Sequence, residues 1–198
     1  MPLHIKQKKR RMRKLKTIEM HRLSVEQFKA AEKMPLIVVL DNVRSLYNVG
    51  SVFRTADAFR VQAIYLCGVT GCPPNAEIHK TALGGEDSVD WKCFKDTEDA
   101  VRELHDKGYY VWSVEQVEGS TKLGYPSSCL YPSGEGAKPC AVILGNEVKG
   151  VQQSVVDMSD GCLEIPQFGT KHSLNVSITA GIVIWEFAKN YKLKNSQL

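Results

Sequence analysis

An arginine one turn inside a predicted helix is the first candidate for chemistry. Residues 41–56 follow an apolar run and place Asn48, Gly50 and Arg54 at the mouth and first turns of that helix. Gly50 and Arg54 are four residues apart, so they share one helical face. Backbone N–H groups at a helix start beside a guanidinium can bind an anion such as a phosphate. An ordinary helix cap with a surface arginine would leave the same pattern.

Two further loops place glycines and polar residues after apolar runs. Residues 144–150, LGNEVKG, match neither the G-x-x-x-x-G-K phosphate loop nor the G-x-G-x-x-G dinucleotide fingerprint, so they favour neither a nucleoside triphosphate nor a nicotinamide cofactor. Residues 165–177, IPQFGTKHSLNVS, lead into a predicted helix that Ser173 or Asn175 could cap. His172 has no evident second ligand or acid–base partner, so we interpret it as a surface residue.

The loops connect segments that alternate between strand and helix patterns. Apolar runs predict strands over residues 36–40, 63–67, 89–94, 109–114, 141–144 and 162–165. Apolar stripes and capping signals predict helices over residues 24–31, 48–59, 73–83, 97–108, 151–156 and 175–190, with Ser24 and Thr97 as caps. This alternation predicts an α/β fold, a mostly parallel sheet with helices on both faces. In such sheets ligands bind beyond the carboxyl ends of the strands, where the three loops lie.

Length and composition are those of one ordinary globular domain. The chain has 198 residues, of which 43% are hydrophobic and 24% charged. Disordered, collagen-like and disulfide-scaffold classes are therefore excluded. No apolar run approaches the roughly 18 residues that a membrane span requires, so we expect no membrane partner.

The cysteines indicate neither a metal site nor a redox motif. None of the six forms a C-x-x-C pair, which argues against zinc-ribbon and thioredoxin-like sites, and no metal is predicted. We interpret all six as small, buried residues of a reduced, cytoplasmic protein. The basic N-terminus lacks the apolar region of a secretory signal, whereas a transit peptide remains an alternative.

Positive charge is concentrated at the N-terminus. Residues 1–33 hold 11 Lys or Arg and 3 acidic side chains, a net charge of +8, whereas the remaining 165 residues carry a net charge of −4. Such a block either solubilises the chain, targets it or binds a polyanion, and we favour contact with a nucleic-acid backbone. The predicted substrate-binding residues are Lys8, Lys9, Arg10, Arg11, Arg13 and Lys14.

In this order, NVGSVFRTA at residues 48–56, LGNEVKG at 144–150 and IPQFGTKHSLNVS at 165–177 resemble the three motifs of the SpoU (TrmH) family. These are RNA 2′-O-methyltransferases of the SPOUT superfamily. The resemblance covers residues 36–188 and implies a C-terminal trefoil knot and a homodimer. We therefore divide the chain into a basic arm with a short helix, residues 1–34, and a SPOUT methyltransferase domain, residues 35–198.

The resemblance also implies the cofactor and the residues that bind it. S-adenosylmethionine is expected in the knotted region, against Leu144, Gly145, Ile165 and Leu174, with Glu115 as a further contact. Adenine needs apolar walls and a few backbone donors and acceptors, which bent loops supply.

Within the motifs, Arg54 matches the catalytic arginine of the family and Asn48 its partner. Because an arginine stays protonated, we expect Arg54 to position the reacting phosphate and ribose rather than to act as a free base. Glu147 and Asn175 also match motif positions, and we expect them to shape the pocket and the dimer.

The predicted activity is transfer of a methyl group to a ribose 2′-hydroxyl of structured RNA, with tRNA favoured over rRNA. The alternative is a non-catalytic RNA-binding protein that keeps the methyltransferase fold. A small-molecule methyltransferase is disfavoured by the basic arm. One departure from the family pattern is Gln167, which stands where many members have a hydrophobic residue.

Overall fold

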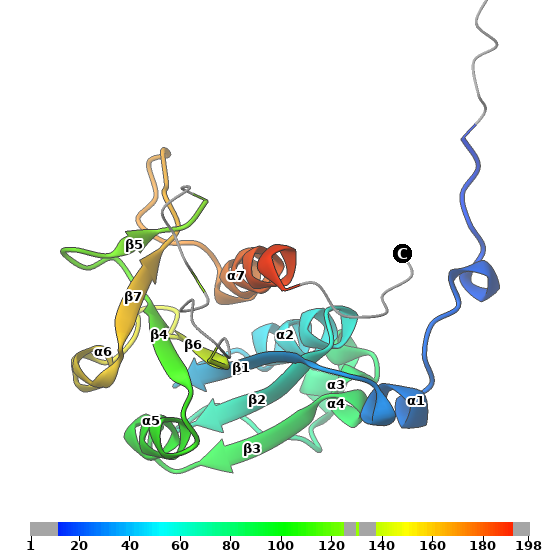
Figure 1. Cartoon of the computed structure of the whole chain (residues 1–198), viewed down its shortest axis with the longest axis horizontal. Coiled ribbons are helices and arrows are strands. Elements are labelled where there is room, and N and C mark those ends of the chain that lie inside the picture. The colour runs from blue at the N-terminus through cyan, green and yellow to red at the C-terminus, as the bar shows by residue number, and fades with distance from the viewer. Residues whose placement is uncertain (1–11, 125–129, 131–137, 192–198) are drawn as a thin grey trace, which may run out of the picture.

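A single seven-stranded parallel sheet forms the centre of the computed structural model, which describes residues 12–124, 130 and 138–191 (Figure 1). Its strand order is β3-β2-β1-β6-β4-β7-β5, and every pair of neighbouring strands runs parallel. The strands are β1 (Met34–Asp41), β2 (Val61–Cys67), β3 (Asp90–Phe94), β4 (Tyr110–Val114), β5 (Thr121–Lys122), β6 (Cys140–Leu144) and β7 (Gly161–Glu164). The predicted α/β class with a parallel sheet is confirmed.

Helices cover both faces of this sheet (Figure 1). They are α1 (Val25–Ala30), α2 (Leu46–Ala58), α3 (Ala76–Ala82), α4 (Gly85–Ser88), α5 (Thr97–Asp106), α6 (Gln153–Met158) and α7 (Val176–Asn190), preceded by the 3₁₀ turn η1 (Thr17–Met20). Side chains of β1 alternate between two cores, Val38 packing with α2 and α7 and Val39 with α5 and α6. A strand buried on both faces reads as a continuous apolar run, which is why β1 was recognisable.

Most predicted elements are present, with small differences at their ends. The chain also forms three short elements that its sequence did not predict: η1, α4 and β5. Ser24 caps α1 as predicted, accepting a hydrogen bond from the Gln27 N–H. Thr97 is not a cap, because it is the first residue of α5 and its hydroxyl donates to Asp41 at 2.6 Å.

The cysteines differ from the prediction at two positions. Cys72 and Cys93 form a disulfide between the segment after β2 and the edge strand β3, so the interpretation that all six are reduced is wrong for this pair. Cys67 and Cys140 are free and buried as expected, and Cys162 is free and half-buried. Cys129 lies outside the described residues. No helix in the described part of the chain is long and apolar enough to span a membrane.

Candidate active site

The loops that carry the motifs start from the same edge of the sheet. Leu40 at the end of β1 is in register with Leu144 at the end of β6. Leu144 is in turn in register with Val114 of β4, which pairs with Leu163 of β7. The segments that follow these strands therefore meet beyond the carboxyl ends of the sheet, as the sequence predicts.

A hydrogen-bond chain joins all three motif loops. The carboxylate of Glu147, in the second loop, accepts from the backbone N–H groups of Arg44 and Ser45, each at 3.1 Å. It also accepts from the side-chain amide of Asn48 at 3.2 Å. The Asn48 Oδ1 then accepts from Asn175 Nδ2 at 3.1 Å, which reaches the third loop. Residues about 100 positions apart in the sequence are thus brought together, as expected for Glu147, Asn48 and Asn175.

These donors also set the charge state of Glu147. Burial alone raises the pKa of its carboxyl group, but the N–H groups of Arg44 and Ser45 and the amide of Asn48 outweigh burial. The pKa of Glu147 therefore lies below its ordinary value, and the group is an anion at neutral pH. Asn175 uses its Oδ1 to accept from the Ser177 N–H at 2.9 Å, so it is the cap of α7.

The second loop is a tight turn that only glycine permits at two positions. Asn146 and Gly150 exchange backbone hydrogen bonds of 3.0 and 2.9 Å. A Cβ atom on Gly145 would lie 2.1 Å from the backbone nitrogen of Val151, and one on Gly150, where φ is +68°, would lie 2.1 Å from Glu115 Oε2. Glu115 Oε2 accepts from the Val151 N–H at 3.1 Å, which fastens the end of the turn to the residue directly after β4.

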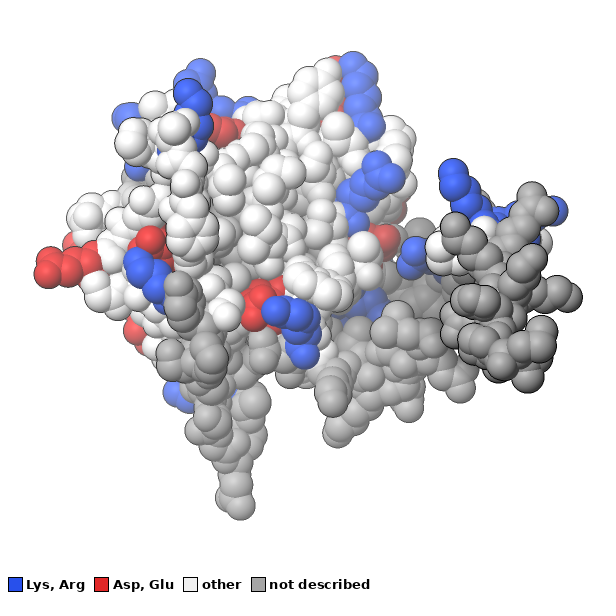
Figure 2. Space-filling view, turned by 90° about the horizontal axis from the view of Figure 1, so that it is seen from above, with Lys and Arg blue, Asp and Glu red and all other residues white. Residues whose placement is uncertain are grey.

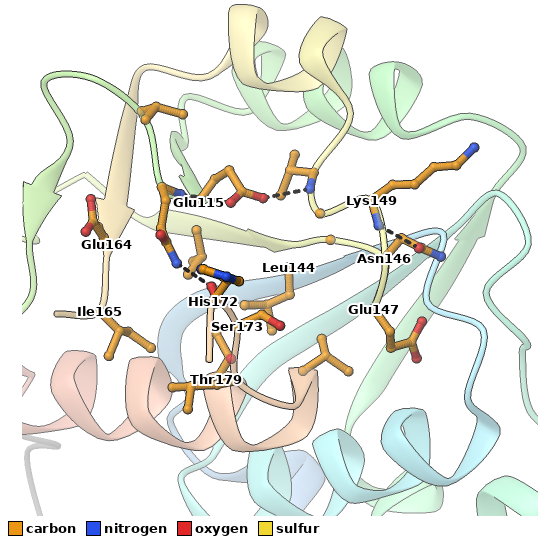
Figure 3. Close-up of a pocket in the computed structure, with 18 of the residues that line it drawn as sticks. Glu115, Leu144, Asn146, Glu147, Lys149, Glu164, Ile165, His172, Ser173 and Thr179 are labelled. Atoms are coloured by element: carbon orange, nitrogen blue, oxygen red, sulfur yellow. Dashed lines mark hydrogen bonds between the residues drawn. The ribbon is translucent and has the colours of Figure 1, made fainter. Parts of the chain in front are cut away.

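A cavity of about 490 Å³ opens between these loops (Figure 3). All five residues predicted to bind a cofactor line it: Glu115, Leu144, Gly145, Ile165 and Leu174. Its size is that of sites for drug-sized ligands. His172 lies in its lining with an exposed side chain, and the His172 carbonyl accepts from Gln116 Nε2 at 2.8 Å. The sequence indicated exposure of His172 but not its place at the cavity.

Asp41 is a buried residue that the sequence analysis did not single out. It is fully buried at the end of β1 and accepts from Thr97 Oγ1 at 2.6 Å. It also accepts from both the backbone and the side-chain nitrogens of Gln152, at 3.0 and 2.9 Å. Asp41 therefore ties the exit of the second loop to the start of α5. An acid directly after a wholly apolar strand was the available signal.

Comparison with known proteins identifies the family. Residues 35–185 match the family described as the SpoU rRNA Methylase family. The chain belongs to this family. It is 31% identical over 165 residues to a 23S rRNA (guanosine-2′-O-)-methyltransferase of Neisseria meningitidis, covering 83% of this chain and 62% of that relative. It is 28% identical over 179 residues to a tRNA (guanosine(18)-2′-O)-methyltransferase of Thermus thermophilus, covering 89% and 85%.

Solved structures give the same result for the fold. The AdoMet-bound rRNA methyltransferase of Sinorhizobium meliloti superposes with a TM-score of 0.69 at 26% identity, covering 82% of this chain and 62% of that one. The chain thus spans less than two thirds of the rRNA relative from N. meningitidis and of this structural neighbour.

Among the motif residues of this SpoU-family chain, Arg54 stands apart. Its side chain is exposed on α2 and does not line the cavity, whereas Asn48 is joined to the loops through Glu147. The backbone nitrogen of Arg54 lies beside α4, where a Cβ on Gly85 would be 3.2 Å away. Within a single copy, the structure does not bring Arg54 into the cavity with the predicted cofactor residues.

The basic arm is described only in part. Arg13 donates to both carboxylate oxygens of Glu19, at 2.9 and 3.0 Å, and this contact raises the pKa of Arg13. Lys14 is exposed. The remaining predicted RNA contacts, Lys8, Lys9, Arg10 and Arg11, lie outside the described residues.

Proposed function

We propose that this SpoU-family protein transfers a methyl group from S-adenosylmethionine to a ribose 2′-hydroxyl of structured RNA. The observation that carries the proposal is the Glu147–Asn48–Asn175 chain, which closes three motif loops around one cavity. Relatives are named guanosine 2′-O-methyltransferases of tRNA and of 23S rRNA. We keep the expectation that tRNA is favoured over rRNA as the substrate.

The cavity fits S-adenosylmethionine by the chemistry of its lining. Leu144, Ile165 and Leu174 supply apolar contacts for an adenine ring, and the bent backbone around Gly145 supplies N–H and C=O groups. Glu115 adds a carboxylate that shapes the turn. When bound, S-adenosylmethionine supplies the methyl group on a positively charged sulfur. The chain's own residues must hold the RNA hydroxyl in line with that methyl group and exclude water from it.

Arg54 is the residue to which we assign this positioning. In the described part of the chain it forms no ion pair, so its planar guanidinium is open to hold an RNA phosphate through two hydrogen bonds. Holding reacting groups in line supplies several kcal/mol of a barrier, on the order of 7–11 kcal/mol in the best intramolecular cases. The proton of the 2′-hydroxyl passes to a phosphate oxygen or a neighbouring group, because an arginine does not accept it.

A homodimer completes the proposed site, because Arg54 lies outside the cavity of its own chain. The outer face of α7 carries Ile178, Ile182 and Trp185, which are 56%, 37% and 54% exposed. Seen from the side of α7, the middle of this surface has few charged residues (Figure 2). An exposed apolar patch of this kind favours a protein contact, and we propose that a second copy of the chain binds there.

We propose a C-terminal trefoil knot, supported by the return of residues 165–175 to Asn48 after β7. We propose that residues 1–34 form an RNA-binding arm and that residues 35–198 form the methyltransferase domain. The proposed location of the protein is the cytoplasm. Deleting residues 1–16 is expected to weaken RNA binding and flatten its salt dependence while leaving S-adenosylmethionine affinity unchanged. Equal RNA affinity after the deletion would exclude a role of the arm in RNA binding.

The decisive experiment is methyl transfer from labelled S-adenosylmethionine to purified total tRNA and, separately, to ribosomal RNA. The expected result is labelled ribose at a discrete nucleotide, found by mapping the modified RNA. Calorimetric titration with S-adenosylmethionine separates the alternative of a non-catalytic RNA-binding protein. RNA binding without cofactor binding or label would support that alternative and exclude the methyltransferase.

A further inference from the structure

Three basic residues around the cavity are without acidic partners among the described residues. Arg44, Lys149 and Lys171, one from each motif loop, are exposed, and none of them forms an ion pair with a described residue. Lys149 extends away from the cavity (Figure 3). Several other cations of the described chain are held by carboxylates, as in the pairs Lys29–Asp90, Lys80–Glu77, Lys92–Glu103 and Arg102–Asp99. At the cavity itself, Lys122 pairs with Glu164, which is one of the lining residues.

The same rim presents an aromatic ring to water. Phe168 is 93% exposed, the second most exposed of the large hydrophobic residues described after Met12. It follows Gln167 and precedes His172, which both line the cavity. The loop that carries Phe168 is anchored by hydrogen bonds of the residues that follow the ring. Gln116 Nε2 donates to the His172 carbonyl, and Asn175 Nδ2 donates to Asn48 Oδ1. The ring therefore stands out from a loop that is anchored to the site.

Such a ring contributes nothing to the core, because its apolar surface stays in water. No acidic residue occurs between Ile165 and Asn175, and Lys171 follows three residues after the ring. An exposed aromatic beside unpaired cations is the combination that binds single-stranded or splayed RNA, since bases stack on the ring and phosphates contact the cations. Unpaired positive charge favours a polyanion over a second copy of this chain on the same rim.

We infer that Phe168 stacks on an RNA base next to the target nucleotide, while Lys171 and Lys149 hold the adjoining phosphates. This inference rests on the proposed function for its partner, RNA. The proposed RNA contact lies at the tip of the third loop, outside the cavity and separate from the basic arm. Stacking is tolerant of base identity, so the contact fixes the position of the RNA more than its sequence.

The test compares three substitutions of one ring in the full chain. Phe168→Ala and Phe168→Leu are expected to raise the KM for purified tRNA about tenfold, the loss of one base–aromatic stack. Phe168→Trp keeps a stacking surface and should stay within about twofold of the wild type. Val69→Ala, which shortens another exposed apolar side chain outside the motif loops, is the matched control. S-adenosylmethionine affinity should be unchanged in all four.

Results with the Phe168 variants can overturn the inference. If Phe168→Leu binds tRNA like the wild type, an apolar side chain suffices and the ring does not stack. If Phe168→Ala changes the sedimentation coefficient of the protein, the ring belongs to a contact between proteins. For the cations, Lys171→Gln should reduce the slope of log K against log salt by about 0.7–0.9, and an unchanged slope removes Lys171 from the phosphate contact.

Failure of the proposed function is distinguishable from failure of this inference. Direct tRNA binding, followed by fluorescence anisotropy, does not require methyl transfer. If Phe168→Ala weakens tRNA binding but the wild type transfers no methyl group, the proposed function is overturned and the inference is supported. A wild type that methylates tRNA with a KM insensitive to Phe168→Ala would do the reverse.

Discussion

The edge of the sheet at β3 and the motif loops beyond the carboxyl ends of the strands use charged side chains in different ways. Near the edge strand β3, carboxylates meet cations: Glu103 accepts from both Lys92 and Lys107, and Asp90 accepts from Lys29. At the three motif loops, two carboxylates meet neutral N–H groups instead, although Glu164 at the end of β7 pairs with Lys122. Glu147 and Glu115 accept from backbone nitrogens, and the exposed Arg44, Lys149 and Lys171 form no ion pair with a described residue.

This difference separates charges that hold the fold from charges that are available to a ligand. A carboxylate that accepts from backbone N–H groups fixes the path of a loop without neutralising a cation. The loops at the cavity are therefore shaped by acids and amides, while their lysines and arginines remain open to an anion. Near β3, Lys29, Lys92 and Lys107 are instead paired with carboxylates within the fold, and Lys95 is the exception.

The largest expected effect, on the rate of methyl transfer, comes from replacing an arginine of the first motif, with an arginine near β3 as the control. Arg54→Lys keeps the charge but loses the planar fork, so we expect the rate of methyl transfer to fall at least about 100-fold, with S-adenosylmethionine affinity unchanged. Arg102→Lys makes the same chemical change in an exposed pair with Asp99 and should leave the rate within about twofold. Single-turnover transfer to tRNA measures both. Near-native turnover of Arg54→Lys would remove Arg54 from the reaction.

A backbone constraint gives the next effect. Gly145→Ala places a Cβ atom 2.1 Å from the Val151 nitrogen, which forces the second loop apart. We expect S-adenosylmethionine affinity to fall at least about 30-fold, which calorimetry would detect, because the loop forms one wall of the cavity. Gly169→Ala meets no atom within 4 Å and should leave cofactor affinity unchanged. Equal affinities for the two variants would show that the turn does not shape the cofactor site.

The sequence could predict the elements because local patterns determine them. The apolar run of β1 and the polar residues before α7 are signals that lie within a few positions of each other. The motif resemblance located the residues of the cavity, and the structure places all five predicted cofactor residues in one lining. These predictions required only spacing along the chain.

The contacts between loops could not be predicted, because their partners are far apart in sequence. Asn48 and Glu147 are 99 residues apart, and Asp41 and Gln152 are 111 residues apart. Thr97 looked like a helix cap, but its hydroxyl instead donates to the buried Asp41 carboxylate. The position of Arg54 outside the cavity also follows from how α2 packs in the fold. That packing cannot be predicted from a local sequence pattern.

A smaller effect is expected for the amide at the centre of the loop network. Asn48→Ala removes its hydrogen bonds to Glu147 and Asn175, which should lower the free energy of unfolding by about 1–2 kcal/mol and weaken S-adenosylmethionine binding several-fold. Asn75→Ala removes the cap of α3 and should cost about 1 kcal/mol without changing cofactor affinity. Urea unfolding and calorimetry measure the two quantities. Unchanged cofactor affinity in Asn48→Ala would show that the network is structural only.

The smallest effect belongs to the charge pairs near β3 and depends on pH. Hydrogen bonds from Lys107, and next from Lys92, lower the pKa of Glu103 to about 2. An unfolded glutamate titrates near pH 4.3, so these contacts stabilise the fold above about pH 4.3, and the stabilisation is lost as the pH falls toward 2.

The Glu103 side chain is 23% exposed, so solvent reduces its contribution to about 1 kcal/mol. When the pH falls from 6 to 3, the free energy of unfolding of the wild type, measured with urea, should decrease. The decrease in Glu103→Gln should be smaller by about this amount. S-adenosylmethionine affinity at pH 7 should be equal in the two proteins, because Glu103 lies outside the cavity lining. A change in cofactor affinity would contradict the separation between charges that hold the fold and charges that serve the site.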